Sequence, residues 1–417
     1  MKTRYLILIL CVFVILTGCT GLRSTPGALQ FRVGAASAPV TPPVGTFLAG
    51  YDSNRRSTGV HDDLYAKAVV FDDGTSPVAV VVVDCVGLQY PTVNAMRALA
   101  ASKTTEVTLP AERIIITSTH THCGPDVIGL WGPDSAQSGY DTAYMDQLVQ
   151  TTADQVARAA ANLQPARIVC AETQCSGWAV NDSEPGEVDH TVSVLQCLDQ
   201  NGKSIATLTN FACHPTVLDG DTTVASSDWV GAFYGAMAAA LPGEHLFLQG
   251  AIGGWIQPVT PERTFALAEK YGKDLADKTL TALKSATAVK EPNVKFANRP
   301  FVMPVANEAF KQMSALKLIP RPMRDGAETE VAWFSIGPAQ FATHPGESAP
   351  VFSNQTKALM DTGPKFVLGL GFDELGYIIK PAFFQNSTIP HSEYLTSMSP
   401  GPDAGPKMME ALEAIVP

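Results

Sequence analysis

Positive charge is scarce in this chain of 417 residues. Lys and Arg together number 29 against 40 Asp and Glu, and the formal net charge is −11 at pH 7. No basic stripe is present that would hold a phosphate backbone or an anionic lipid surface, so we expect no nucleic-acid partner. Any role at a membrane must therefore come through a lipid anchor or an apolar groove.

Cysteine is also sparse, and no internal repeat is visible. Beyond two cysteines in the first 19 residues, six remain, too few for the dense disulfide framework of a small exported domain. Cys170 and Cys175 are close enough in sequence either to bridge a strand and its turn or to stay free. Cys123 and Cys213 are each adjacent to a histidine. They fit zinc ligands or buried small hydrophobic residues, and we expect burial.

The N-terminal segment is typical of an exported lipoprotein. Lys2 and Arg4 precede the apolar run 5–16, and Leu16-Thr17-Gly18-Cys19 resembles a bacterial lipobox. The run is too short to span a bilayer comfortably, so cleavage is expected. An ordinary signal peptide with an incidental Cys19 is the alternative.

Three expectations follow for this end of the chain. Residues 1–18 form a lipoprotein signal peptide, Cys19 becomes the lipidated N-terminus, and residues 19–29 form a tether with glycine and proline. Removal of the signal peptide takes two positive charges, so −11 becomes −13. The mature protein is then expected to be extracytoplasmic and anchored to a membrane, in the periplasm or at the cell surface.

The remaining chain is typical of a large globular domain. The full sequence has 46% hydrophobic and 17% charged residues, a composition that suits a sizeable hydrophobic core. Residues 287–328 are the least regular stretch and a weak candidate for a subdomain seam. We predict strands at 66–71 and 77–84, a strand that runs from Ile114 through His122 until Gly124-Pro125 stops it, and strands at 166–171, 191–199, 204–211, 245–249, 329–336, 338–343 and 365–370. We predict helices at 92–102, 142–162, 231–241, 262–286 and 404–415. This alternation predicts an α/β fold, with mixed β-sheets layered with helices in a single large catalytic domain over residues 30–417.

The stretch Ile114–Pro125 carries the first chemical signal. Three β-branched residues lead into His120-Thr121-His122, and Gly124-Pro125 ends the run. Side chains two apart on a strand share a face, so both imidazoles could close on one metal ion. A lone His-x-His also arises by chance, and the assignment depends on further ligand-type residues elsewhere.

Such residues recur at three later strand ends, each beside Gly or Pro. They are His214 before Pro215, Glu347 after Pro345-Gly346, and Tyr377 after Gly376. Taken singly, each fits a structural histidine, a turn carboxylate or a core tyrosine. Taken jointly, they favour one site.

These elements resemble the neutral/alkaline ceramidase family, in the family's order and over about residues 30–400. The Thr-His-Thr-His-x-Gly-Pro element is quite specific, whereas the Gly-Glu and Gly-Tyr elements are weak alone. The matching residues are Leu48-Ala49-Gly50-Tyr51, Gly59-Val60-His61-Asp62, Thr119–Pro125, Asn210–His214, Pro345-Gly346-Glu347 and Gly376-Tyr377-Ile378.

The resemblance implies a zinc-dependent hydrolase of linear amides that acts on an N-acyl sphingoid base or related ceramide-like lipid amide. The implied Zn²⁺ ligands are His120, His214, Glu347 and Tyr377, and His122 becomes the neighbouring acid/base. Zinc lowers the pKa of bound water to roughly 7 and polarises the amide carbonyl. Imidazole suits the proton transfer, and Tyr377 would stabilise the oxyanion. No protein partner is predicted, and the family's C-terminal immunoglobulin-like domain is expected to be missing.

The chain departs from the family at two places. Gly253–Pro258 lacks the Asp and Ser of the family's Gly-Asp-x-Ser-Pro loop, and Asn181 is followed by Asp182 instead of Arg. Rival functions are therefore hydrolysis of another N-acyl or ester substrate, or ligand binding by a non-catalytic lipoprotein. Asp84 fits either a carboxylate that orients a ligand imidazole or a solvated strand end. Among the other histidines, His61 and His344 are expected nearest the cleft.

Overall fold

The computed structural model describes residues 30–290, 292–361 and 363–417. The predicted signal peptide (1–18), the lipidated Cys19 and the tether (19–29) lie outside the described residues. Within the described part, none of the helices has the length and apolar character that crossing a bilayer requires.

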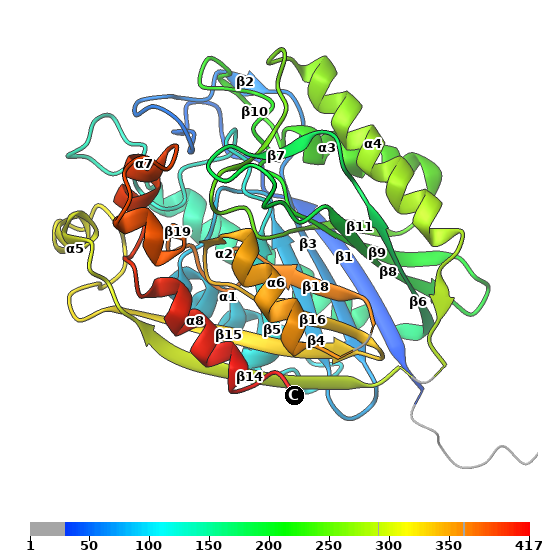
Figure 1. Cartoon of the computed structure of the whole chain (residues 1–417). Helices are drawn as coiled ribbons and strands as arrows, with labels where there is room; N and C mark the ends of the chain where they lie inside the picture. The colour runs from blue at the N-terminus through cyan, green and yellow to red at the C-terminus, as the bar shows by residue number, and fades with distance from the viewer. Residues whose placement is uncertain (1–29, 291, 362) are drawn as a thin grey trace, which may run out of the picture.

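A mixed nine-stranded sheet forms the centre of the fold (Figure 1). Its strand order is β11-β9-β8-β6-β1-β3-β4-β5, with β13 paired to β6. The pairs β4–β5 and β9–β11 are parallel and the others are antiparallel. The strands are β1 (Arg32–Pro39), β3 (Tyr65–Asp72), β4 (Val78–Val83), β5 (Ile114–Ser118), β6 (Gln164–Gln174), β8 (Thr191–Asp199), β9 (Ser204–Phe211), β11 (Glu244–Gln249) and β13 (Thr287–Ala288).

A four-stranded sheet packs against this core. It has the order β14-β15-β16-β18, from β14 (Val294–Met303), β15 (Ala327–Ile336), β16 (Ala339–Thr343) and β18 (Lys365–Leu368). Phe341 lies between Phe334 and Phe366, with ring centroids 4.5 and 4.2 Å apart, and all three belong to the core of the large sheet. Trp333 and Ala342 point to the opposite face, into a second cluster with α6 and α8. This alternation of side chains joins both sheets into one fold.

Eight α-helices surround the sheets in the part of the chain that the structure describes. Two have Pro at the first or second position, and four are capped by an Asp, Thr or Asn side chain that accepts from a first-turn N–H. In Figure 1, α3 and α4 lie together beside β11, and α8 lies along β15. The helices are α1 (Tyr90–Lys103), α2 (Thr142–Ala161), α3 (Trp229–Ala240), α4 (Phe265–Leu283), α5 (Glu308–Ala315), α6 (Pro350–Leu359), α7 (Ser392–Ser397) and α8 (Ala404–Glu413).

The predicted α/β class with mixed sheets is confirmed, and β8 and β9 have the predicted bounds. The expectation that 287–328 is the least regular stretch is wrong, although the chain does pass from the nine-stranded sheet to the four-stranded sheet between β13 and β14. There β14 pairs over ten residues with β15, and α5 follows it. β14 escaped prediction because most of its residues are exposed or half-buried, which leaves little apolar alternation to detect.

A candidate metal centre beside an apolar pocket

His120 and His122 meet in a turn and not on a strand. β5 ends at Ser118, and His120 has the positive φ of 70° that non-glycine residues rarely adopt. The two rings nevertheless lie close, with centroids 4.8 Å apart and a steep interplanar angle of 69°. The two rings therefore do not converge because they share one face of a strand, as expected. They converge because the chain turns at His120, which has a left-handed backbone conformation.

Backbone carbonyls orient the imidazoles of His120 and His214. His120 Nδ1 lies 2.5 Å from the carbonyl oxygen of Val86, and His214 Nδ1 lies 2.7 Å from that of Ile256. Because a carbonyl only accepts, each Nδ1 carries the proton and each Nε2 presents a lone pair. This is the way ligand imidazoles are commonly held.

Both lone pairs face the same carboxylate oxygen. Glu347 Oε2 lies 3.0 Å from His214 Nε2 and 3.5 Å from His120 Nε2. Burial, and then the neighbouring His122 and His214, hold the pKa of His120 well below its usual value, so its ring stays neutral. Buried hydrogen-bond acceptors that face one another are unfavourable unless a cation lies between them. The donor set therefore fits a divalent metal ion of the kind that imidazole and carboxylate bind.

Two candidate ligand groups share His120. One joins His120, His122 and His214, the other joins His120, Glu347 and Glu374, and within each the ligand atoms lie within 4.8 Å of one another. The structure thus brings together His120, His214 and Glu347 from three distant parts of the chain.

Neither group includes Cys123, and burial raises the pKa of its thiol to about 12, which disfavours the thiolate that zinc binds.

Tyr377 joins the site through backbone pairing. The short strands β17 (Glu347–Ser348) and β19 (Tyr377–Ile378) run parallel, with Glu347 opposite Tyr377. Burial and the negative charge of Glu347 raise the pKa of Tyr377 well above its usual value. The phenol therefore stays protonated and available as a hydrogen-bond donor at neutral pH.

His122 differs from its neighbours because neither ring nitrogen has a hydrogen-bond partner among the described residues. Its ring is held by packing, with Tyr51 at 5.1 Å and His214 at 5.8 Å between centroids. Burial, followed by the charges of His214 and Arg55, lowers the pKa of His122 well below its usual value. A neutral imidazole carries its proton on one nitrogen and a lone pair on the other, so His122 has one nitrogen that can accept a proton.

Gln249, at the end of β11, is a positioning residue that the sequence interpretation missed. Its side-chain amide donates to the carbonyls of Thr119 and Cys213, at 2.9 and 3.0 Å, and accepts from the N–H of Cys213 at 3.2 Å. Thr119 and Cys213 directly precede His120 and His214, so one amide ties both histidine segments together. The sequence pattern that could have indicated Gln249 is a polar residue that ends an apolar strand directly before Gly250.

Several expectations about neighbouring residues were wrong. Asp84 is neither solvated nor bonded to an imidazole: it is 1% exposed and accepts from the N–H of Tyr65 at 2.8 Å, and burial raises its pKa to about 6. His344 is buried between the hydroxyls of Ser348 and Thr356. His61 stacks on Phe265 instead of lining the cleft. Asp84 does not orient a ligand imidazole, because backbone carbonyls orient the rings of His120 and His214.

The described cysteines are all free and buried, so Cys170 and Cys175 form no disulfide. One of the two family departures, at Asn181, has a structural role in this chain. Asn181 is 3% exposed, and its side chain accepts from the N–H groups of Ser183 and Glu184 at 3.0 and 2.8 Å. It therefore shapes its own loop, and no arginine follows it.

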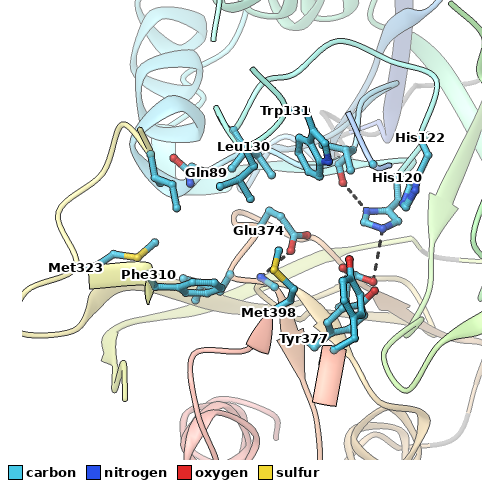
Figure 2. A pocket seen from close by; sticks show the side chains of 18 residues that line it. Gln89, His120, His122, Leu130, Trp131, Phe310, Met323, Glu374, Tyr377 and Met398 are labelled. Carbon is cyan, nitrogen blue, oxygen red and sulfur yellow. Dashed lines mark hydrogen bonds and ion pairs between the residues drawn. The ribbon is translucent and has the colours of Figure 1, made fainter. Parts of the chain in front are cut away.

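An apolar pocket opens beside the candidate ligands. Figure 2 shows His120 and His122 at one end of it and Phe310 and Met323 at the other, with Glu374 between them. Its apolar walls come from segments that the sequence left unassigned, including α5 and the turn after β5. Its lining residues include Gln89, Leu130, Trp131, Phe310, Met323 and Glu374.

The fold and the site together define a mixed α/β protein with a candidate His/Glu metal site at the end of an apolar pocket. A family model described as neutral/alkaline non-lysosomal ceramidase, N-terminal, matches residues 31–246, just over half of the chain. The chain therefore belongs to this family.

Curated relatives agree with the assignment. Neutral ceramidase of Mycobacterium tuberculosis is 24% identical over 284 residues, which are 58% of this chain and 44% of that protein. Neutral ceramidase of Pseudomonas aeruginosa is 24% identical over 218 residues, 48% of this chain and 32% of that protein. The matches thus span less than half of the length of either relative.

Solved structures share the fold. The crystal structure of neutral ceramidase from Pseudomonas aeruginosa superposes with a TM-score of 0.75 at 16% identity, covering 93% of this chain and 75% of that one. A ceramidase complexed with C2 superposes equally well, with a TM-score of 0.75 at 15% identity and the same coverage. The likeness extends well beyond the residues that the family model matches, and so includes the second sheet.

Proposed function

We propose that this protein is a zinc-dependent amide hydrolase of the ceramidase type, which cleaves an N-acyl sphingoid base or a related lipid amide. One observation carries the proposal: two imidazoles, each fixed through Nδ1 by a backbone carbonyl, aim Nε2 at one buried carboxylate at the end of an apolar pocket. The proposed ligands are His120, His214, Glu347 and Tyr377.

A zinc ion held there would supply an activated water near neutral pH and a Lewis acid for the amide carbonyl. The residues of the chain do the rest. His122, neutral and without partners, accepts the proton of the attacking water and passes it to the leaving amine. Tyr377, kept protonated by burial and by Glu347, donates a hydrogen bond to the developing oxyanion.

The pocket supports a lipid substrate. Its walls are apolar side chains such as Leu130, Trp131, Phe310 and Met323, and the described residues that line it include no Lys or Arg. Burial of a hydrocarbon chain there is favourable by roughly 0.8 kcal/mol per methylene, whereas an anionic lipid head would find no counter-charge. The names of the relatives agree with a ceramide-like substrate.

Metal content and hydrolysis of the purified full-length chain in detergent test the proposal. We expect about one zinc per chain and release of fluorescent fatty acid from a labelled N-acyl sphingoid base, with loss of activity on chelation and recovery with Zn²⁺. A matched ester of the same acyl group tests the rival substrate class. A chain that binds zinc and cleaves only the ester would reject the amide assignment, and one that binds lipid without zinc or turnover would indicate a binding protein.

Replacement of Gly50 by Ala is expected to lower the activity about 100-fold, because a misplaced catalytic group is costly. A Cβ at Gly50 would lie 2.4 Å from Cγ of His122, so the ring must move. Gly45 is the matched control: its φ of 97° is nearly that of Gly50 at 98°, but nothing lies within 4 Å of its Cβ position. Both variants carry an Ala at positive φ, and thermal melts check that each is folded, whereas kcat/KM should fall only for Gly50→Ala. Equal activity losses would refute the steric explanation.

A further inference from the structure

Arg55 is a buried cation beside the site that has no part in the proposed ligand set or in proton transfer. It is only 6% exposed, and its hydrogen bonds within the described part of the chain all go to backbone carbonyl oxygens. Removing a charge from water without a counter-charge is costly. An apolar residue of similar shape would avoid that cost, so the guanidinium at this position needs a reason besides stability.

The guanidinium joins three segments of the chain around the site. Its Nη2 donates to the carbonyls of Ala49 and His122. Its Nη1 donates to the carbonyls of Thr222 at 3.0 Å and Asp219 at 3.4 Å, in the loop that follows the proposed ligand His214. One planar group with fixed donor directions therefore sets the backbone of the acid/base residue relative to the rest of the site.

Tyr51 extends this support to the imidazole itself. Its ring meets that of His122 edge to face, with centroids 5.1 Å apart and an interplanar angle of 67°. The guanidinium carbon of Arg55 lies 4.8 Å from the centroid of the same tyrosine ring, and the Tyr51 hydroxyl donates to the carbonyl of Leu218. Arg55 thus contacts both the backbone of His122 and the ring that packs on its side chain.

This support matters because the imidazole of His122 has no other anchor among the described residues. Both of its ring nitrogens are without hydrogen-bond partners, whereas backbone carbonyls fix the rings of His120 and His214. The orientation of His122 therefore depends on its own backbone and on packing. A general acid/base must lie within hydrogen-bond reach of the proton that it moves, so this orientation decides the rate of proton transfer.

We propose that Arg55 is a positioning residue, which places the imidazole of His122 for proton transfer and takes no part in metal or substrate binding. The inference rests on the proposed function and deepens it, because it names the group that holds the acid/base in place. Arg55 does not line the pocket, so its loss should lower kcat while KM and zinc content stay at the wild-type level.

The first test replaces Arg55 by Met in the full-length chain, which removes the donors and keeps an unbranched apolar side chain. With a labelled N-acyl sphingoid base in detergent, kcat should fall about 100-fold, as for other misplaced catalytic groups. Arg56→Met is the matched control. The guanidinium of Arg56 also lies over an aromatic ring, 3.7 Å from the centroid of Phe47, and donates to the carbonyl of Gly45 at 2.9 Å. It does not contact His122, so kcat should be unchanged.

A double-mutant cycle separates positioning from general support of the fold. In the His122→Ala background, Arg55→Met should cause no further loss of kcat, because the group that Arg55 places is gone. A residue that only stabilised the fold would lower kcat in both backgrounds. Arg55→Lys keeps the charge and part of the donor set. It should show a smaller loss, again only where His122 is present, and it serves if Arg55→Met does not fold.

Circular dichroism, thermal melts and zinc analysis accompany each variant. Equal fractional losses of kcat in both backgrounds, loss of zinc from a folded Arg55 variant, or wild-type kcat in every folded Arg55 variant would each overturn the positioning role. Failure of both Arg55 variants to fold would also overturn it, because Arg55 would then serve the fold itself. A wild-type protein that cleaves no N-acyl amide would instead refute the proposed function, so the two failures are distinguishable.

Discussion

Replacement of either His120 or His214 by Ala is expected to abolish both zinc binding and amide hydrolysis. Each supplies an Nε2 lone pair directed at Glu347 Oε2, so its loss removes a ligand and leaves the carboxylate facing a void. Changes to residues that only support a ligand already cost roughly 10–100-fold in metal affinity, and loss of a ligand should cost more. Zinc content after dialysis and kcat/KM measure the two effects.

His61→Ala provides the control for these variants. Its side chain is 48% exposed and stacks on Phe265, outside the pocket lining, so zinc and activity should be unchanged. Circular dichroism and a thermal melt check that each variant is folded. Wild-type zinc content in folded His214→Ala would remove His214 from the proposed ligand set.

His122→Ala is expected to lower kcat by about 100- to 10,000-fold while zinc content stays at the wild-type level. The range is that of a lost general acid/base. The division of roles follows from the surroundings: His120 and His214 are each fixed by a carbonyl, whereas both nitrogens of His122 are free. Kinetics and metal analysis on the same preparation measure both quantities.

Added imidazole extends this test. The truncated side chain leaves space for it, so partial recovery of the rate in His122→Ala is expected, with little effect on His120→Ala. If His122→Ala instead emptied the metal site and kept the fold, His122 would be a ligand. The group His120, His122 and His214 would then describe the centre better.

The metal-site residues could be selected from the sequence because each stands at a visible boundary. His120 follows a run of isoleucines, and Glu347 follows Pro-Gly. Such positions lie where a buried strand meets solvent, which local patterns detect. Gln89 and Glu374 could not be ranked in this way, because nothing in their local sequence distinguishes them from other polar residues at turns.

The sequence also did not show why the side chains of His120 and His122 lie close together. The alternation of a strand suggested that His120 and His122 share a face, but β5 had ended and a left-handed residue had turned the chain. Similarly, the half-exposed β14 carries too weak an apolar pattern to be recognised, although it pairs along its whole length with β15.

The sequence by itself determined the family, the α/β class and the residue types able to bind a metal, because hydrophobic periodicity and turn residues are local properties of the chain. Only the tertiary structure decided which nitrogen of each imidazole is free, that Asp84 has no part in the site, and that Gln89 and Glu374 share a pocket wall. Those features depend on contacts between residues that are separated in the sequence, by 34 positions for His120 and Val86 and by 42 for His214 and Ile256, which no local pattern encodes.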